Sequence, residues 1–162
     1  MFDDLHAKLD AIFEARAKRI TEAQRVRVER DKKQEANLQA FLELQESVIR
    51  PTLEALANYL TDRGEESGIY ESTDGQQKGN EKLPAAIGIK FYRHVIMKSL
   101  TKEKVPSLNF LLDKDAGQVL IQYDTSTTQR EGVSGESTVD LGAVTADLIS
   151  AEALKVIQII FK

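Results

Sequence analysis

The sequence predicts an α+β protein with a long N-terminal helix, a small sheet and a C-terminal helix packed on that sheet. All nine glycines lie after residue 63, and the residues before that point include a single proline, Pro51. The spacing of apolar residues changes from steps of three and four to steps of two after residue 84, and returns to three and four near residue 145. These observations divide the chain into a helical oligomerisation segment (1–63), a linker or long loop (64–84) and a small α+β domain (85–162).

The first segment has an apolar stripe with helical spacing and no residue that would end a helix early. The stripe consists of Phe2, Leu5, Leu9, Ile12, Phe13 and Ile20. Residues 3–49 fit a single coiled-coil-like rod about 70 Å long, or a helical hairpin that turns between residues 30 and 37. The hairpin lacks a glycine or proline for its turn, so we favour the rod. Since no small domain could cover such a stripe, the rod implies a dimer or larger oligomer.

A second apolar stripe follows, in which Leu42, Ile49 and Leu56 stand seven residues apart. It predicts an oligomer interface made of Leu38, Leu42, Ile49, Leu53, Leu56 and Leu60. Pro51 should kink the helix or restart it as a separate segment. That segment should end at Arg63, with Gly64 as the residue that terminates it.

Charge is unevenly distributed along this helix. Residues 16–33 have a net charge of +5 and residues 34–66 a net charge of −5. The candidate contacts for nucleic acid or another polyanion are Arg16, Arg19, Arg25, Arg27, Arg30, Lys32 and Lys33. No aromatic residue is interleaved with them for base stacking, so a solvated face, or one complementary to an acidic neighbouring helix, is favoured. Arg16 and Arg19 fall on the apolar stripe, which indicates contact with a partner.

The glycine-containing half predicts strands of alternating character. Within 64–84 we expect one short strand, at residues 68–72. The strand positions that follow are Ile87, Ile89, Phe91, Arg93, Val95 and Met97, then Leu108, Phe110 and Leu112, then Val119, Ile121 and Tyr123, and last Ser137, Val139 and Leu141. Residues 94–104 could form a short helix instead. Hairpin loops are expected at 113–117 and 129–135, which gives three to five mostly antiparallel strands.

The C-terminal helix is predicted over residues 145–161. Its apolar face consists of Leu148, Ile149, Leu154, Ile157 and Phe161, and Ser150 is the expected cap of its main part. This helix should complete the core of the small domain.

The residues that carry chemistry are sparse. There is no cysteine and there are two histidines, His6 and His94, too few for a histidine metal site. Asp113, Asp115 and Gly117 fit a hairpin turn better than a calcium loop. No cofactor or metal site is predicted. No secretory leader or membrane span is visible, so we expect a soluble cytoplasmic protein that does not bind membranes.

The favoured hypothesis is a non-enzymatic, homo-oligomeric interaction protein. Its helices would mediate assembly, and its α+β domain would present a surface to another protein or a ligand. The first alternative is a nucleic-acid-associated protein that uses the basic block 16–33. The second is an enzyme with a site near Tyr92, Arg93 and His94.

Overall fold

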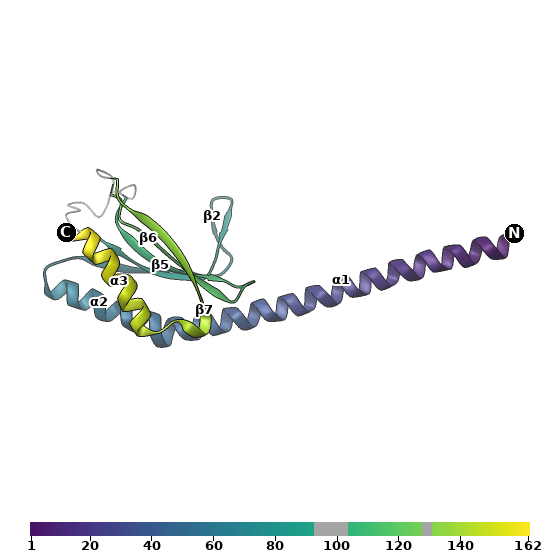
Figure 1. The fold of residues 1–162 in the computed structure, drawn as a ribbon, viewed down its shortest axis with the longest axis horizontal. Helices are drawn as coiled ribbons and strands as arrows, with labels where there is room; N and C mark the ends of the chain where they lie inside the picture. The colour runs from purple at the N-terminus through teal and green to yellow at the C-terminus, as the bar shows by residue number, and fades with distance from the viewer. Residues whose placement is uncertain (93–103, 128–130) are drawn as a thin grey trace.

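The computed structural model describes residues 1–92, 104–127 and 131–162 and has the predicted mixed α+β architecture (Figure 1). The elements are α1 (Phe2–Leu44), a π-helical segment (Gln45–Ile49), α2 (Arg50–Asp62), β1 (Ser67–Ser72), β2 (Gln76–Lys78), β3 (Glu81–Leu83), β4 (Ala86–Phe91), β5 (Ser107–Asp113), β6 (Gln118–Asp124), β7 (Ser134–Asp140), a 3₁₀ turn (Leu141–Ala143) and α3 (Ala146–Ile160). Most of α1 extends away from a body formed by the other elements.

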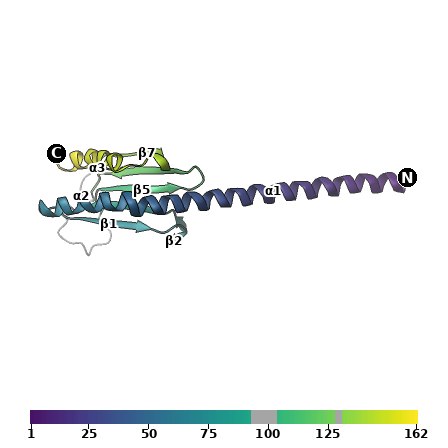
Figure 2. The same cartoon turned by 90° about the horizontal axis from the view of Figure 1, so that it is seen from below.

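The long N-terminal helix is the predicted rod and not a hairpin. The break expected at Pro51 takes the form of the π-helical segment just before it. Pro51 has no N–H group, and the N–H of Arg50 donates to the carbonyl of Gln45, five residues earlier. The helix therefore continues past Pro51 as α2, with a bend at the junction of α1 and α2 that Figure 1 shows and the view of Figure 2 hides.

Helix α2 ends as predicted at Gly64. The N–H of Glu65 donates to the carbonyl of Leu60 at 2.9 Å, and the N–H of Gly64 to that of Thr61 at 3.0 Å. This pair of bonds is the Schellman motif, and it requires the positive φ of 77° that Gly64 adopts.

The main sheet has five antiparallel strands in the order β1-β4-β5-β6-β7. Alternate residues of the central strands point toward the helices and are buried: Ile87, Ile89, Phe91, Leu108, Phe110, Leu112, Val119 and Ile121. The C-terminal end of α1, α2 and α3 all lie over this one face (Figure 2). The core therefore consists of one helical layer packed on one sheet.

Several boundaries differ from the sequence-based expectations. Segment 64–84, expected as a linker with one short strand at 68–72, contains that strand as β1, an edge strand of the main sheet, and also the hairpin β2–β3, which was not expected. Leu141 follows β7 in a 3₁₀ turn. The described residues leave out the positions Arg93, Val95 and Met97, most of the alternative helix at 94–104, and residues 129–130 of the loop expected at 129–135.

Helix α3 lies where it was predicted, and part of the predicted apolar face packs inward: Ile149 is buried, and Leu148 and Ile157 are half-buried against the core. Its N-cap is Thr145, whose hydroxyl accepts a hydrogen bond from the N–H of Leu148 at 3.2 Å; Ser150 lies inside the helix. Its buried residues are Ile149, Ala153 and Val156, while Leu154, expected on the apolar face, is 55% exposed. The charged residues Asp147 and Lys155 lie away from the face that meets the sheet, which is marked by apolar residues four, three and four positions apart: Ile149, Ala153, Val156 and Ile160.

Candidate interaction surfaces

The N-terminal part of α1 is a solvent-exposed helix. Every residue from 1 to 33 is exposed, and among the described residues the first hydrogen bond between α1 and the body is made by Arg30. We call residues 1–29 the free half of α1. Its exposed large apolar side chains, apart from Met1, are Phe2, Leu5, Leu9, Ile12, Phe13, Ile20, Val26 and Val28. The predicted stripe is thus present and is not covered by this chain.

A polar contact at the β5–β6 turn marks the end of the free half. The Arg30 guanidinium pairs with Asp115 at 3.2 Å, and Gln34 donates to the same carboxylate. Asn37 Nδ2 donates to the carbonyl of Lys114 at 2.8 Å. The hydrogen bond from Arg30, with a second from Gln34, holds the pKa of Asp115 below its ordinary value. The sequence predicted this turn, with Gly117 at φ 67°, but not its contact with α1, which joins residues about 80 positions apart.

The candidate polyanion contacts all lie on exposed parts of α1. Arg25 pairs with Glu22 and Glu29 on its own helix, and Arg30 pairs with Asp115. The other five make no ion pair among the described residues: Arg16, Arg19, Arg27, Lys32 and Lys33. At about 100° per residue, Arg16, Arg19, Arg27 and Lys33 fall within roughly a third of the helix circumference, and Lys32 lies on the opposite side.

The predicted oligomer interface over residues 38–60 is mostly an internal surface. Ile49, Leu53 and Leu60 are buried in the core of their own chain. Leu38 and Leu56 are half-buried against that core, and Leu42 is 38% exposed. The physical reason is the five-stranded sheet, which offers this stripe an apolar face within the same chain. Leu42 is the one member of the set still classed as exposed.

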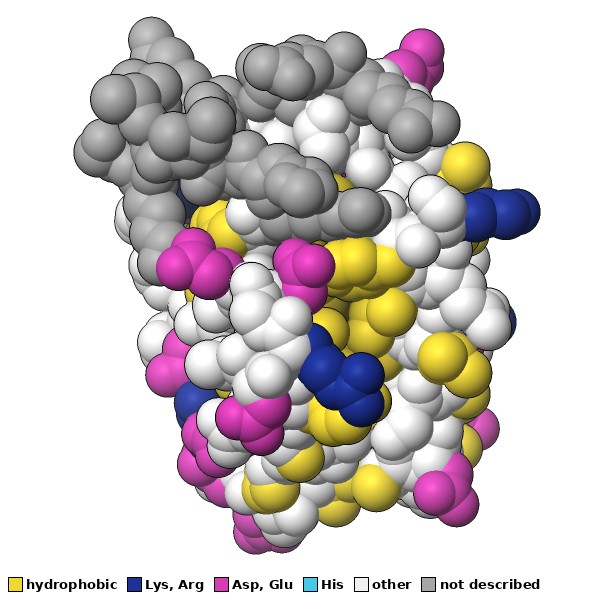
Figure 3. Space-filling view, turned by 90° about the vertical axis from the view of Figure 1, so that its left-hand side faces the viewer, with side chains coloured by type: hydrophobic (Ala, Val, Ile, Leu, Met, Phe, Trp, Pro, Cys, Tyr) yellow, Lys and Arg dark blue, Asp and Glu magenta, His cyan; other side chains and the backbone are white. Residues whose placement is uncertain are grey.

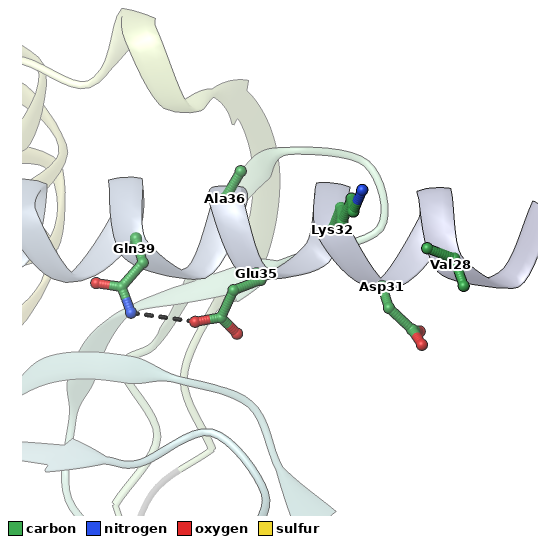
Figure 4. Close-up of a pocket in the computed structure, with 6 residues that line it drawn as sticks. All are labelled: Val28, Asp31, Lys32, Glu35, Ala36 and Gln39. Atoms are coloured by element: carbon green, nitrogen blue, oxygen red, sulfur yellow. Dashed lines mark hydrogen bonds between the residues drawn. The ribbon is translucent and has the colours of Figure 1, made fainter.

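The hollows along α1 are open helix surfaces. One is lined by Val28, Asp31, Lys32, Glu35, Ala36 and Gln39, where Gln39 Nε2 donates to Glu35 Oε1 at 3.3 Å (Figure 4). A second is lined by Ala23, Val26, Arg27, Arg30, Asp31 and Gln34. Because a single helix supplies all the lining residues, neither hollow encloses a substrate. The part of the chain that the structure describes holds no cluster of potential metal ligands.

The sheet face opposite the helices carries a polar and aromatic cluster. Tyr70, Gly88 and Asn109 stand side by side on neighbouring strands, and Lys90 Nζ lies 4.7 Å from the centre of the Tyr70 ring. Burial raises the pKa of Tyr70 to about 12, although a hydrogen bond with Ser107 opposes this shift. A Cβ at Gly88 would meet Asn109 Oδ1 at 2.3 Å, so only glycine admits this packing.

Two features of this cluster bear on function. Asn109 Oδ1 is buried and accepts no hydrogen bond in the described part of the chain. Tyr92, from the alternative enzyme site, belongs to the same face, whereas Arg93 and His94 lie outside the described residues. Sequence reasoning missed Tyr70, Lys90 and Asn109; a glycine within the apolar run of β4 was the available signal for a close approach.

A further exposed apolar region lies on α2 and α3, at the end of the body away from the free half. Tyr59 is 56% exposed and Leu154 55%, and Ile159 is also exposed. The Arg63 guanidinium lies 5.0 Å from the centre of the Tyr59 ring. Figure 3 views this end and shows hydrophobic side chains gathered on its surface.

Comparison with known proteins gives no match to a family model, to a curated protein or to a solved structure. Among the described residues, no helix is both long enough and apolar enough to cross a membrane. The surfaces themselves therefore carry the functional argument.

Proposed function

We propose that this chain is a homo-oligomeric interaction protein whose free half of α1 holds the oligomer together. The observation that carries the proposal is the exposure of eight large apolar side chains between residues 2 and 28 of one helix. A contiguous apolar stripe on a soluble chain is typical of an interaction site. From Phe2 to Ile20 these residues recur at three, four or seven positions, which suits a second helix, and the stripe thins at Val26 and Val28.

The free half also needs a partner for its own order. Its local stabilisation comes from helix-forming residues and from ion pairs such as Asp4–Lys8 at 2.9 Å, and each such pair contributes only about 0.2–0.5 kcal/mol. Most helical stability in proteins comes from packing an apolar face. A partner helix would supply that packing.

The α+β body then presents the binding surface. We expect a protein or ligand to bind on the open face of the sheet, at the cluster of Tyr70, Lys90 and Asn109. The half-buried ring of Tyr70 offers apolar area, and Lys90 offers a positive charge and hydrogen-bond donors. This combination suits a ligand that has both apolar and hydrogen-bonding groups.

Sedimentation equilibrium tests the assembly. The chain should have at least twice its mass of 18.1 kDa, and Leu9→Asp should lower that mass to the monomer because it places a carboxylate in an apolar contact. Ala11→Asp is the matched control: residues two apart lie on roughly opposite sides of a helix, so it should leave the oligomer intact. A wild-type chain that stays monomeric at high concentration would contradict the proposal.

Polyanion binding is a second candidate, and one observation favours it: five basic side chains on the exposed helix have no ion-pair partner among the described residues. Gel shifts with duplex DNA at several salt concentrations test it. Binding that falls steeply with salt and is lost in Arg25→Glu/Arg27→Glu/Arg30→Glu would support it. Absence of binding at low salt would exclude it.

A further inference from the structure

The apolar stripe and the body lie on the same side of α1. Ile12 and Phe41 are 29 residues apart, as are Leu5 and Gln34, and 29 residues make about eight helical turns. Phe41 is buried in the core, and Gln34 donates to Asp115 of the β5–β6 turn. Since α1 runs without a sharp bend (Figure 1), Leu5 and Ile12 point toward the side on which the body lies.

This placement restricts how two copies can pair through their stripes. Two parallel helices in register, stripe against stripe, would bring both bodies into the same space between them. Two antiparallel helices place the bodies at opposite ends. The body also limits the overlap: the start of one copy's stripe, at Phe2, can be placed no further along the other copy than its β5–β6 turn, near Arg30. Phe2 then lies level with residues 30–31 of the second copy, and the midpoint falls near Arg16 and Ala17.

Charge favours the same arrangement. The side chains of residues 1–15 have a net charge of −3, from four acids and Lys8, and those of residues 16–33 a net charge of +5. The antiparallel overlap sets each acidic segment against the other copy's basic segment, with Glu14 close to the level of Arg19. A parallel arrangement would set like charges together along the whole overlap and would place both Arg16 and Arg19 opposite their own copies within the stripe, whereas the antiparallel register does so for Arg16 alone, at its midpoint.

The surface of α1 also fits this register. Ala23, Val26, Arg27 and Arg30 line a hollow just before the body. Their spacing of i, i+3, i+4 and i+7 is that of a hole which receives one side chain from a facing helix. In the antiparallel overlap limited by the body, Leu5 of the second copy lies level with residues 27–28, at this hollow.

We propose that the partner of the free half is a second copy of this chain in antiparallel orientation, with each N-terminus reaching the β5–β6 turn of the other body. This inference rests on the proposed function and adds its geometry. The two bodies stand at the two ends of a paired-helix rod, so the dimer displays two copies of the open sheet face at a set distance. The rod would set the distance between two bound partner molecules, or between the two sites that a bivalent partner must reach.

The chain has no cysteine, so single cysteines can carry spin labels without further changes. Ala7 and Ala17 are both exposed, so the variants Ala7→Cys and Ala17→Cys would carry the spin label on the surface. In the antiparallel dimer, Ala7 of one copy lies level with residues 25–26 of the other. The two Ala7 positions are therefore separated by about 18–19 residues, or about 28 Å along the rod. The two Ala17 positions lie about 10 Å apart, the spacing between packed helix axes. Double electron–electron resonance of the full-length chain should therefore give a long distance at residue 7 and a short one at residue 17.

The outcomes separate this inference from the function on which it rests. A dimer with short distances at both positions would be parallel, which overturns the orientation and leaves the assembly proposal standing. A dimer in which the distances at residues 7 and 17 both exceed about 50 Å, well beyond the interaxial spacing of packed helices, would be assembled through another surface. That result would overturn the antiparallel inference and the assembly proposal. A monomeric mass for the labelled and unlabelled chains would also overturn both.

Salt gives a second readout that does not depend on labels. Opposite charges across the antiparallel contact attract and are screened by salt. The dissociation constant should rise several-fold between about 0.05 M and 0.5 M sodium chloride. A dissociation constant that falls with salt would indicate like charges facing each other and would contradict the antiparallel pairing.

Discussion

The two halves of the long helix have similar apolar spacing but opposite environments. Phe13 in the free half is 59% exposed, whereas Phe41 in the stretch that meets the sheet is fully buried. We call residues 34–62 the packed half. The comparison shows that apolar periodicity identifies a face that packs against something. It does not say whether the partner surface belongs to the same chain.

Different forces hold the two halves in helical form. The free half depends on helix-forming residues and short-range ion pairs such as Arg25–Glu29 at 2.8 Å. The packed half gains about 1.5–3 kcal/mol from each large apolar side chain that it buries, among them Phe41, Ile49 and Leu53. The free half should therefore fray in a monomer, while the packed half unfolds only with the body.

The largest expected effect on stability comes from comparing one type of substitution, phenylalanine to alanine, made separately in each half. Phe41→Ala should lower the free energy of unfolding of the body by about 3–5 kcal/mol, because it leaves a cavity in the core. Phe13→Ala should leave the unfolding of the body almost unchanged and weaken self-association. All four tyrosines lie after residue 58, so near-ultraviolet circular dichroism during urea unfolding reports on the body.

Equal losses of body stability in both variants would contradict the division into a free and a packed half. The far-ultraviolet signal at 222 nm serves as the companion measurement, since it includes the free half. At a protein concentration where the wild-type chain is still assembled, Phe13→Ala should reduce that signal, because the dissociated variant loses the packing of its free half.

The end of the packed half supplies the next effect. Gly64→Ala should destabilise the body by about 1–2 kcal/mol, because φ of 77° is unfavourable for a residue with a Cβ. The surroundings are open, with no atom within 4 Å of an added Cβ, so strain in the backbone is the only cost. Thermal unfolding measures it.

Gly142→Ala is the control for this substitution. An added Cβ at Gly142 also meets nothing within 4 Å, and its φ is not positive. Stability should stay the same or rise slightly, because alanine reduces the freedom of the unfolded chain. A loss at Gly142 as large as that at Gly64 would mean that backbone strain is not the cause.

Leu42 tests whether the assembly surface extends into the packed half. It is the exposed member of the predicted interface, at 38%, so Leu42→Asp should change body stability by less than about 1 kcal/mol. If the interface is confined to the free half, the oligomer should keep its mass in sedimentation. Dissociation of a folded Leu42→Asp variant would move the interface toward the body.

The smallest effect concerns the contact at the border between the halves. Arg30→Ala should raise the pKa of Asp115 toward its ordinary value, because the hydrogen bond from Arg30 is the main cause of its lowered pKa. A carboxylate whose pKa is lower in the folded than in the unfolded state stabilises the fold at pH values above its unfolded-state pKa. This stabilisation is lost as the pH falls through the folded-state pKa. The pair is exposed, so the difference in melting temperature from wild type should be small near neutral pH and should vanish in acid.

Carboxyl carbon chemical shifts followed by NMR titration give the pKa of Asp115 directly. An unchanged pKa in Arg30→Ala would show that the ion pair does not form in solution. Gln34→Ala is the companion variant, since Gln34 supplies the second hydrogen bond; its effect should be the smaller of the two.

Local patterns predicted most of the elements correctly. The absence of breakers predicted the rod, alternating residues predicted the inward positions of β4 to β6, and Gly64 and Gly117 marked a helix end and a turn. The errors arose where the answer depends on what packs nearby. Leu154 has helical spacing but faces solvent. In segment 64–84 the expected strand is present and pairs with β4 along its whole length, but the hairpin β2–β3 was not predicted.

By itself, the sequence determined the secondary structure and the presence of two apolar stripes on one long helix, because these follow from local spacing and from the positions of glycine and proline. Only the tertiary structure decided which stripe is internal. Burial of Ile49, Leu53 and Leu60 requires a sheet assembled from strands up to about 90 residues away, and that contact depends on the three-dimensional path of the chain. The free half has no such surface within reach, because the body ends at Asp115, level with Arg30, and the stripe continues beyond it.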